Sequence, residues 1–313
     1  MANILITHGV PAEGFYALRD HNLIIPAPLT AFTADELREH IRTADAVVAG
    51  GKLDGETIRL GKQLKIIANY GAGYDGVDVA AAAACGVPVT NLPTAVQATT
   101  AELAVALMMS VSRRVGEMNL RLRREAPETL FGMGREMGFN LYGKTLGIIG
   151  VGRIGSKVAQ VAKALGMRVI GASRHAATCD LYEAVPMDEL LATADVVSLH
   201  CPLTDETRGL IDAEAISKMK RGAMLINTSR GAVVDSEALA AAVASGHLAG
   251  AGLDVYPDEP HISACLLEQQ RIVLTPHVGA NTADTRYAMA EACSKQILDA
   301  LDGKRPENIV NGL

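Results

Sequence analysis

The 313-residue chain predicts an α/β protein built from two parallel-sheet domains. Three observations lead to this prediction. Short apolar runs alternate with amphipathic stretches, which is typical of a parallel sheet covered by helices on both faces. The alternation comes in two series, separated by a long helical pattern and an irregular stretch. Finally, the length and a hydrophobic content of 49% suffice for about two domains with cores of their own.

The first series covers roughly the first hundred residues, and helical stretches lie between its strand-like runs. The helix after Thr33 has a capping box with Glu36, in which hydroxyl and carboxylate reciprocally accept hydrogen bonds from backbone amides. We expect five strands, at residues 4–7, 22–25, 45–50, 65–69 and 87–91.

Residues 99–124 form the longest helical pattern of the chain. A helix of this length would span about 38 Å, enough to bridge two domains, so we expect one bridging helix. An irregular stretch rich in Gly and Met follows at 125–143. Its Met133, Met137 and Phe139 would either cover an apolar pocket or pack against the long helix, and the sequence leaves both interpretations open.

The second series begins at residue 144 with a strand, a glycine turn and a helix. A last helix is expected over roughly 282–302, with the first domain as its candidate partner. We expect the further strands of this series at residues 168–174, 195–202, 223–229, 251–256 and 271–276.

Composition argues against several classes of protein. The net charge is −6 with dispersed Lys and Arg, and Trp is absent, so a nucleic-acid partner is not expected. No run approaches the roughly 18 apolar residues of a membrane span, and the N-terminus lacks a basic leader, which predicts a cytoplasmic protein. An odd number of cysteines without CxxC spacing predicts reduced thiols and no metal site. The cysteines are Cys85, Cys179, Cys201, Cys265 and Cys293.

The glycine turn GVGRIG, residues 150–155, lies between a strand and a helix. Gly150 permits the tight turn, Gly152 lets the backbone approach a pyrophosphate, and Gly155 allows close packing of helix and strand. The N-terminus of the following helix would face the anion. In this setting the motif predicts a Rossmann-type dinucleotide site.

The second strand of that site ends in Ser173 and Arg174, where NAD-selective sites carry Asp or Glu for the ribose hydroxyls. A guanidinium binds a phosphate through two hydrogen bonds, and a hydroxyl donates beside it. The sequence therefore predicts NADP(H) as the preferred cofactor. The alternative is a solvent-facing Arg174 on a relaxed NAD(H) site, so use of NAD(H) stays open.

Three further candidates lie at successive strand ends: Arg230, Glu259 and His277. These three side chains suit the reduction of a keto acid. The Arg cation would bind the substrate's carboxylate, the His imidazolium would deliver a proton, and the Glu carboxylate would keep that imidazolium charged. Each residue alone is ambiguous, because a lone His is often structural, a Glu between prolines is often a loop residue, and an Arg before Gly is often a surface cap.

Four motifs in this order identify a resemblance: GVGRIG, NTSRGAVVD (227–235), LDVYPDEP (253–260) and TPHVGANT (275–282). The chain resembles the D-isomer-specific 2-hydroxyacid dehydrogenase family, in the branch of glyoxylate and hydroxypyruvate reductases. NYGAGYDGVD (69–78) and TAELAVALMM (100–109) extend the resemblance over nearly the whole chain.

The resemblance implies a flavodoxin-like substrate domain from residues 1–98 plus 282–313 and a Rossmann-like NAD(P)-binding domain from 99–281, with a cleft between them. It also implies a homodimer formed through the cofactor domains. The implied reaction is hydride transfer between the nicotinamide and a small 2-keto or 2-hydroxy acid.

The resemblance also implies roles for residues. Arg230 would bind the carboxylate and carbonyl oxygen of the substrate, His277 would be the general acid and base, and Glu259 would hydrogen-bond His277 and raise its pKa. The implied substrate contacts are Lys52, Ala72, Gly73, Arg230 and His277. The expected cofactor contacts are Gly150, Gly152, Arg153, Ile154, Gly155, Ser173, Arg174, Cys201, Pro202, Thr207, Thr228, Ser229, Arg230, Asp254, His277 and Gly279.

Other functions stay open at this point. An NAD-dependent D-lactate or 3-phosphoglycerate dehydrogenase is one, although a phosphorylated substrate would need more basic residues than Lys52. A dinucleotide-sensing binding protein, like the corepressors that share this fold, is another, because such proteins can retain the catalytic residues.

Overall fold

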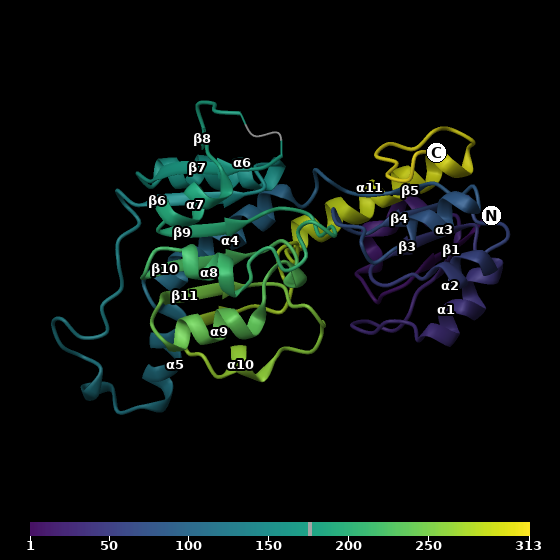
Figure 1. Cartoon of the computed structure of the whole chain (residues 1–313). Helices are drawn as coiled ribbons and strands as arrows, with labels where there is room; N and C mark the ends of the chain where they lie inside the picture. The colour runs from purple at the N-terminus through teal and green to yellow at the C-terminus, as the bar shows by residue number, and fades with distance from the viewer. Residues whose placement is uncertain (175–176) are drawn as a thin grey trace. The chain divides into compact units, whose positions relative to one another are not determined.

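A computed structural model of the chain describes residues 1–174 and 177–313. The described chain forms two compact units (Figure 1). The first unit contains Met1–Val96 and Ala280–Leu313, and the second contains Gln97–Gly279. Among the described residues, no helix combines the length and the apolar character needed to cross a membrane.

The first unit contains a five-stranded parallel sheet in the order β2-β1-β3-β4-β5. Each of the five expected strands is confirmed. The β3 and β4 strands are buried along their whole length, as expected for apolar runs covered on both faces. The strands are β1 (Asn3–Ile6), β2 (Asn22–Ile24), β3 (Ala46–Ala49), β4 (Ile66–Asn69) and β5 (Val89–Thr90).

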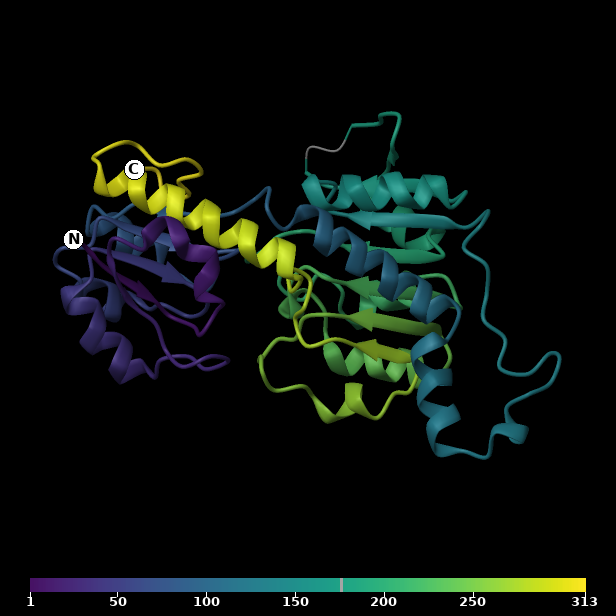
Figure 2. The same ribbon diagram turned by 180° about the vertical axis from the view of Figure 1, so that it is seen from behind.

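Helices cover this sheet, and the last of them comes from the far end of the chain. The expected capping box is confirmed, because the Thr33 amide donates to Glu36 at 2.7 Å and the Glu36 amide donates to Thr33 Oγ1 at 3.3 Å. The expected last helix is also confirmed, and Figure 2 shows it running along the first unit. Its Met289 and Ile297 belong to one apolar cluster with Phe15. The helices are η1 (Ala12–Leu18), α1 (Ala34–His40), η2 (Ile41–Thr43), α2 (Gly55–Leu60), α3 (Val79–Ala84) and α11 (Ala283–Leu301).

The second unit contains a seven-stranded parallel sheet in the order β12-β11-β10-β9-β6-β7-β8. The six expected strands are confirmed, whereas the two-residue edge strand β8 was not predicted, since its residues form no apolar run. The strand order reverses beside β6, where a Rossmann sheet binds its dinucleotide. The strands are β6 (Thr145–Ile149), β7 (Arg168–Ala172), β8 (Glu183–Ala184), β9 (Val196–Leu199), β10 (Ala223–Asn227), β11 (Leu248–Leu253) and β12 (Ile272–Leu274).

Helices lie on both faces of this second sheet. One face packs against α4 and α6 in a single apolar cluster, and the other packs against α7, α8 and α9. The helices are α4 (Gln97–Ser112), α5 (Val115–Arg124), η3 (Pro127–Thr129), α6 (Arg153–Ala164), α7 (Met187–Thr193), α8 (Ala213–Lys218), η4 (Gly231–Val233), α9 (Ser236–Ala244) and α10 (Ala264–Leu267).

The prediction of one continuous bridging helix over 99–124 is wrong. The chain breaks between α4 and α5, where Arg114 has a left-handed backbone with φ of 55°. Its guanidinium lies 2.6 Å from carboxylates of both Glu117 and Glu136. These ion pairs stabilise a conformation that a non-glycine residue rarely adopts. Both helices belong to the second unit.

Residues 125–138, which we call the arm, project from the body of the second unit (Figures 1 and 2). Arg121 ties the two ends of the arm together, with Glu125 at 2.8 Å and Glu136 at 2.6 Å. Met133, Met137 and Phe139 were expected either to cover an apolar pocket or to pack against the long helix. Phe139 packs against the apolar cluster that contains α4. Met133 and Met137 are exposed instead.

Candidate active site

The GVGRIG turn joins β6 to α6 and leaves no room for side chains at two of its glycines. Gly150 has a φ of +92°, and a Cβ there would lie 2.5 Å from the backbone nitrogen of Cys201. A Cβ on Gly155 would lie 2.6 Å from the carbonyl oxygen of Gly150. Gly152, in contrast, faces open space. The turn therefore packs tightly on one side and presents bare backbone on the other.

The surroundings of this turn fit a nicotinamide dinucleotide. Gly152 is the N-cap of α6 and supplies no capping side chain, so the first amides of the helix, from Arg153 and Ile154 onward, suit an anion. Thr228 Oγ1 is buried and has no hydrogen-bond partner among the described residues. A buried hydroxyl without a partner is a group that a ligand satisfies.

At the end of β7, Arg174 does not stand alone. Its Nη1 lies 3.5 Å from Oε2 of Glu206, and both side chains are 71% exposed. Glu206 comes from the turn after β9, where the Thr207 hydroxyl donates to the Pro202 carbonyl at 2.7 Å. Cys201 and Pro202, two of the expected cofactor contacts, begin this same turn. Arg174 thus has an acidic partner that sequence reasoning missed.

Arg230 follows β10 on a turn that Asn227 organises. The Asn227 Oδ1 accepts hydrogen bonds from the amide and the hydroxyl of Ser229, both at 2.9 Å. Its Nδ2 donates to the Arg230 carbonyl at 2.9 Å. Gly231 lets the turn pack closely, since a Cβ there would lie 1.9 Å from the carbonyl carbon of Tyr256. The half-buried Arg230 side chain is thus held at the carboxyl end of the sheet.

Glu259 and His277 form a direct pair. The His277 Nδ1 lies 2.6 Å from Glu259 Oε2, and the Tyr256 amide donates to Glu259 Oε1 at 2.9 Å. Burial acts to raise the pKa of Glu259, but these hydrogen bonds and the positive charges of His277 and Arg230 hold that pKa below its usual value. The influence of Arg230 shows that all three predicted catalytic residues lie in one electrostatic neighbourhood.

Asp254 organises the loop that carries His277. This carboxylate is 1% exposed and accepts hydrogen bonds from the Thr275 hydroxyl at 2.6 Å and from the amides of Val278 and Gly279 at 2.8 and 2.9 Å. The His277 amide donates to the Asp254 carbonyl at 2.9 Å, and His277 has a φ of 51°. Asp254 therefore holds His277 in a backbone conformation that is uncommon for non-glycine residues. Its expected contact with the cofactor stays a prediction.

The predicted substrate contacts Lys52, Ala72 and Gly73 belong to the first unit, at the carboxyl edge of its own sheet. Asn69 donates to the carbonyl of Gly73, and Asn91 donates to the carbonyl of Ala72. Both carbonyls are thereby bound to the protein, while the amides of Ala72 and Gly73 make no hydrogen bond within the described chain. Such a loop suits a carboxylate ligand.

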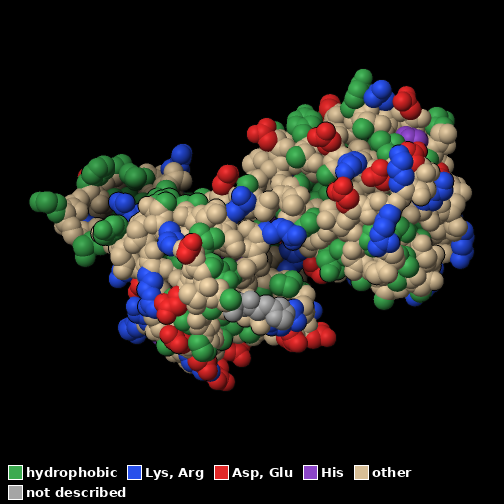
Figure 3. All heavy atoms as spheres, turned by 90° about the horizontal axis from the view of Figure 1, so that it is seen from above, with side chains coloured by type: hydrophobic (Ala, Val, Ile, Leu, Met, Phe, Trp, Pro, Cys, Tyr) green, Lys and Arg blue, Asp and Glu red, His purple; other side chains and the backbone are tan. Residues whose placement is uncertain are grey.

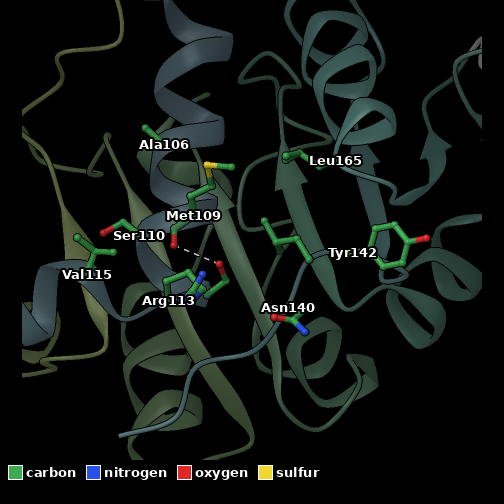
Figure 4. A pocket seen from close by; sticks show the side chains of 10 residues that line it. Ala106, Met109, Ser110, Arg113, Val115, Asn140, Tyr142 and Leu165 are labelled. Atoms are coloured by element: carbon green, nitrogen blue, oxygen red, sulfur yellow. Dashed lines mark hydrogen bonds between the residues drawn. The ribbon is translucent and has the colours of Figure 1, made fainter. Parts of the chain in front are cut away.

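A pocket of about 540 Å³ lies elsewhere on the second unit, and no residue expected in the active site lines it (Figure 4). Its wall is mostly apolar and includes Met109, Val115, Leu141, Tyr142 and Leu165. These residues come from α4, the start of α5, the chain just after the arm and the end of α6. The pocket therefore lies at the base of the arm.

Sequence reasoning missed Asn227 and Glu206. Asn227 precedes Arg230 at the end of an apolar strand, where a polar side chain signals a ligand site, so this position offered a signal. Glu206 offered none, because its partner Arg174 is 32 residues away in the sequence.

A model of the NAD binding domain of D-isomer specific 2-hydroxyacid dehydrogenases matches residues 105–279. The chain belongs to this family. This dehydrogenase is 37% identical over 321 residues to a glyoxylate reductase of Korarchaeum cryptofilum, an alignment that covers 98% of this chain and 95% of the relative. It is therefore an NAD(P)-dependent oxidoreductase.

Two solved structures resemble this dehydrogenase over nearly their full lengths. The TT0316 protein from Thermus thermophilus matches with a TM-score of 0.90 and 39% identity, covering 98% of this chain and 99% of that protein. An NADPH-dependent glyoxylate/hydroxypyruvate reductase from Sinorhizobium meliloti, solved with NADP and malonate, matches with a TM-score of 0.85 and 28% identity, covering 99% and 96%.

Proposed function

We propose that the enzyme reduces small 2-keto acids of the glyoxylate and hydroxypyruvate type to D-2-hydroxy acids, with NADPH as its preferred cofactor. The observation that carries this proposal is the 2.6 Å contact between His277 and Glu259 beside Arg230. The names of the relatives support the substrate class.

The side chains of the site divide the work of the reaction. When bound, the cofactor supplies the hydride that reduces the keto carbon. His277 keeps Nδ1 bonded to Glu259, so Nε2 is the nitrogen that delivers a proton to the substrate oxygen. The ionised Glu259 stabilises the imidazolium that holds this proton, and Arg230 binds the substrate carboxylate and polarises the carbonyl.

The residues around the glycine turn would hold the dinucleotide. The bare backbone at Gly152 and the first amides of α6 suit the pyrophosphate. Ser173 and Arg174 suit a 2′-phosphate. The relative from Sinorhizobium meliloti was solved with NADP, which supports this cofactor preference.

A panel of 2-keto acids tests the proposal. The purified enzyme is assayed with glyoxylate, hydroxypyruvate, pyruvate and 3-phosphohydroxypyruvate, each with NADPH and with NADH, and the chirality of each chiral product is determined. We expect the highest kcat/KM for glyoxylate or hydroxypyruvate with NADPH, and D products. Absence of turnover with every keto acid would contradict the function, and equal use of both cofactors would contradict the NADPH preference alone.

We also propose a homodimer formed through the second unit. The arm carries exposed apolar side chains, with Phe131 at 74%, Met133 at 104% and Met137 at 74% exposure, and Figure 3 shows hydrophobic side chains gathered on this projection. The apolar pocket lies at the base of the same arm. Each copy therefore carries both halves of a self-complementary contact, as a twofold dimer requires. A second copy is the occupant that this geometry favours.

A further inference from the structure

We propose that Glu206 determines how strongly the enzyme discriminates between NADPH and NADH, by competing with the 2′-phosphate for Arg174. The inference rests on the proposed function, since it concerns the same adenosine end of the dinucleotide site. It assigns a specificity role to a residue that lies on neither the glycine turn nor the strand tip.

The position of Glu206 follows from the sheet. β7 and β9 are the two neighbours of β6, and the glycine turn follows β6 directly. Arg174 comes from the end of β7, and Glu206 comes from the turn after β9. The ion pair of 3.5 Å therefore joins the two loops that flank the dinucleotide turn.

Glu206 brings a carboxylate close to the tip of β7, where the sequence itself has no acidic residue. NAD-selective sites place a carboxylate at the end of the second strand, where it accepts hydrogen bonds from the ribose hydroxyls. Here that position holds Ser173 and Arg174, but the carboxylate of Glu206 lies against Arg174. The adenosine end thus carries a guanidinium, which suits a 2′-phosphate, and a carboxylate, which suits a ribose hydroxyl.

The two cofactors then make opposite demands on the pair. A 2′-phosphate competes with Glu206 for Arg174, and the nearby carboxylate repels the phosphate. A ribose hydroxyl can donate to Glu206 while the ion pair persists. Since both side chains are 71% exposed, the pair itself is weak and can be exchanged for a ligand.

The turn keeps Glu206 close to this position. The Thr204 amide donates to the Thr207 hydroxyl at 2.8 Å, and the Arg208 amide donates to the Thr204 carbonyl at 2.9 Å. The backbone around Glu206 is thereby tied on both sides. Asp205 stands on the same turn with no ion pair to a described residue, so it provides a control for the loss of one negative charge.

Binding of two adenosine fragments separates these contributions. The affinities of 2′,5′-ADP and of 5′-ADP are measured by calorimetry for the wild type, Glu206→Gln, Asp205→Asn and Arg174→Gln, together with the ratio of kcat/KM for NADPH to that for NADH. We expect Glu206→Gln to raise the preference for 2′,5′-ADP about three- to tenfold and to raise the kinetic ratio in parallel. Arg174→Gln should abolish the preference, and Asp205→Asn should change it less than twofold.

Each result bears on a distinct claim. If Glu206→Gln shifts the preference no more than Asp205→Asn does, the inference is overturned, although loss of preference in Arg174→Gln still supports the proposed NADPH site. If Arg174→Gln retains the wild-type preference for 2′,5′-ADP, the proposed NADPH site and the inference both fail.

Discussion

His277 and Glu259 share a hydrogen bond of 2.6 Å between Nδ1 and Oε2, although 18 residues separate them in the chain. Two other residues fix the geometry of this pair. The buried carboxylate of Asp254 accepts hydrogen bonds from the amides on the C-terminal side of His277, and the Tyr256 amide orients Glu259. His277, the proposed proton donor, is therefore positioned by Asp254 and hydrogen-bonded to Glu259.

Replacing Glu259 by Gln should move the alkaline limit of keto-acid reduction to lower pH. The pKa of Glu259 lies below its usual value, so the carboxylate is ionised throughout the neutral range and stabilises the imidazolium of His277. A neutral amide does not, and turnover at pH 7 should fall about tenfold or more. The check is the pH profile of kcat/KM, with the exposed Glu268→Gln as control. An unchanged profile would count against the pairing.

Replacing Arg230 by Ala should raise the KM for the keto acid about a hundredfold and lower kcat as well. In the proposed mechanism the guanidinium binds the substrate carboxylate and polarises the carbonyl, so both constants should depend on it. Steady-state kinetics with glyoxylate provide the measurement, and Arg208→Ala on an exposed turn is the control. A variant that loses only cofactor affinity would show that Arg230 does not bind the substrate.

His200 should make the fold sensitive to mild acid. Burial lowers the pKa of His200 to about 4, whereas an unfolded histidine titrates near 6.5. As the pH falls from 6.5 to 4, the unfolded chain binds a proton that the folded chain does not, so stability falls by up to about 3 kcal/mol. Chemical unfolding across this range should give a shallower slope for His200→Gln than for the wild type. His261→Gln, which removes an exposed histidine, is the control and should keep the wild-type slope. A wild-type slope in His200→Gln would contradict this account.

Charges on the arm should dissociate the proposed dimer. Phe131→Glu and Met133→Glu place carboxylates where the apolar contact with the second copy is expected, and each should weaken dimerisation about a hundredfold. Sedimentation velocity measures the effect, with Leu267→Glu as a control because Leu267 is 60% exposed on α10, outside the arm. A monomeric wild type, or dimers in both arm variants, would contradict the proposal.

Local patterns in the sequence predict most of the fold. Apolar runs identify eleven of the strands, because a buried parallel strand needs a continuous apolar segment. The break at Arg114 escapes such reasoning, since helical periodicity continues across it. The partner that helps to hold Arg114 there, Glu136, lies on the far side of the arm. Contacts between distant segments therefore decide the one helix that was predicted wrongly.

The site shows the same division. GVGRIG and the strand-end positions of Arg230 and His277 can be recognised because parallel strands gather their carboxyl ends at one edge of the sheet. The acid beside Arg174 cannot be recognised, because Glu206 comes from a turn that only the strand order brings near. The sequence therefore predicts candidate residues of the site, whereas the pairing of Arg174 with Glu206 follows only from the folded structure.

The most direct test of the account compares His277→Ala with His261→Ala, an exposed histidine of the same unit. The measurements are kcat for glyoxylate reduction and the dissociation constant of NADPH. We predict that His277→Ala lowers kcat at least about a hundredfold with nearly unchanged NADPH affinity, and that His261→Ala behaves as the wild type. Near-normal turnover of His277→Ala at neutral pH would contradict the central claim that His277 supplies the proton.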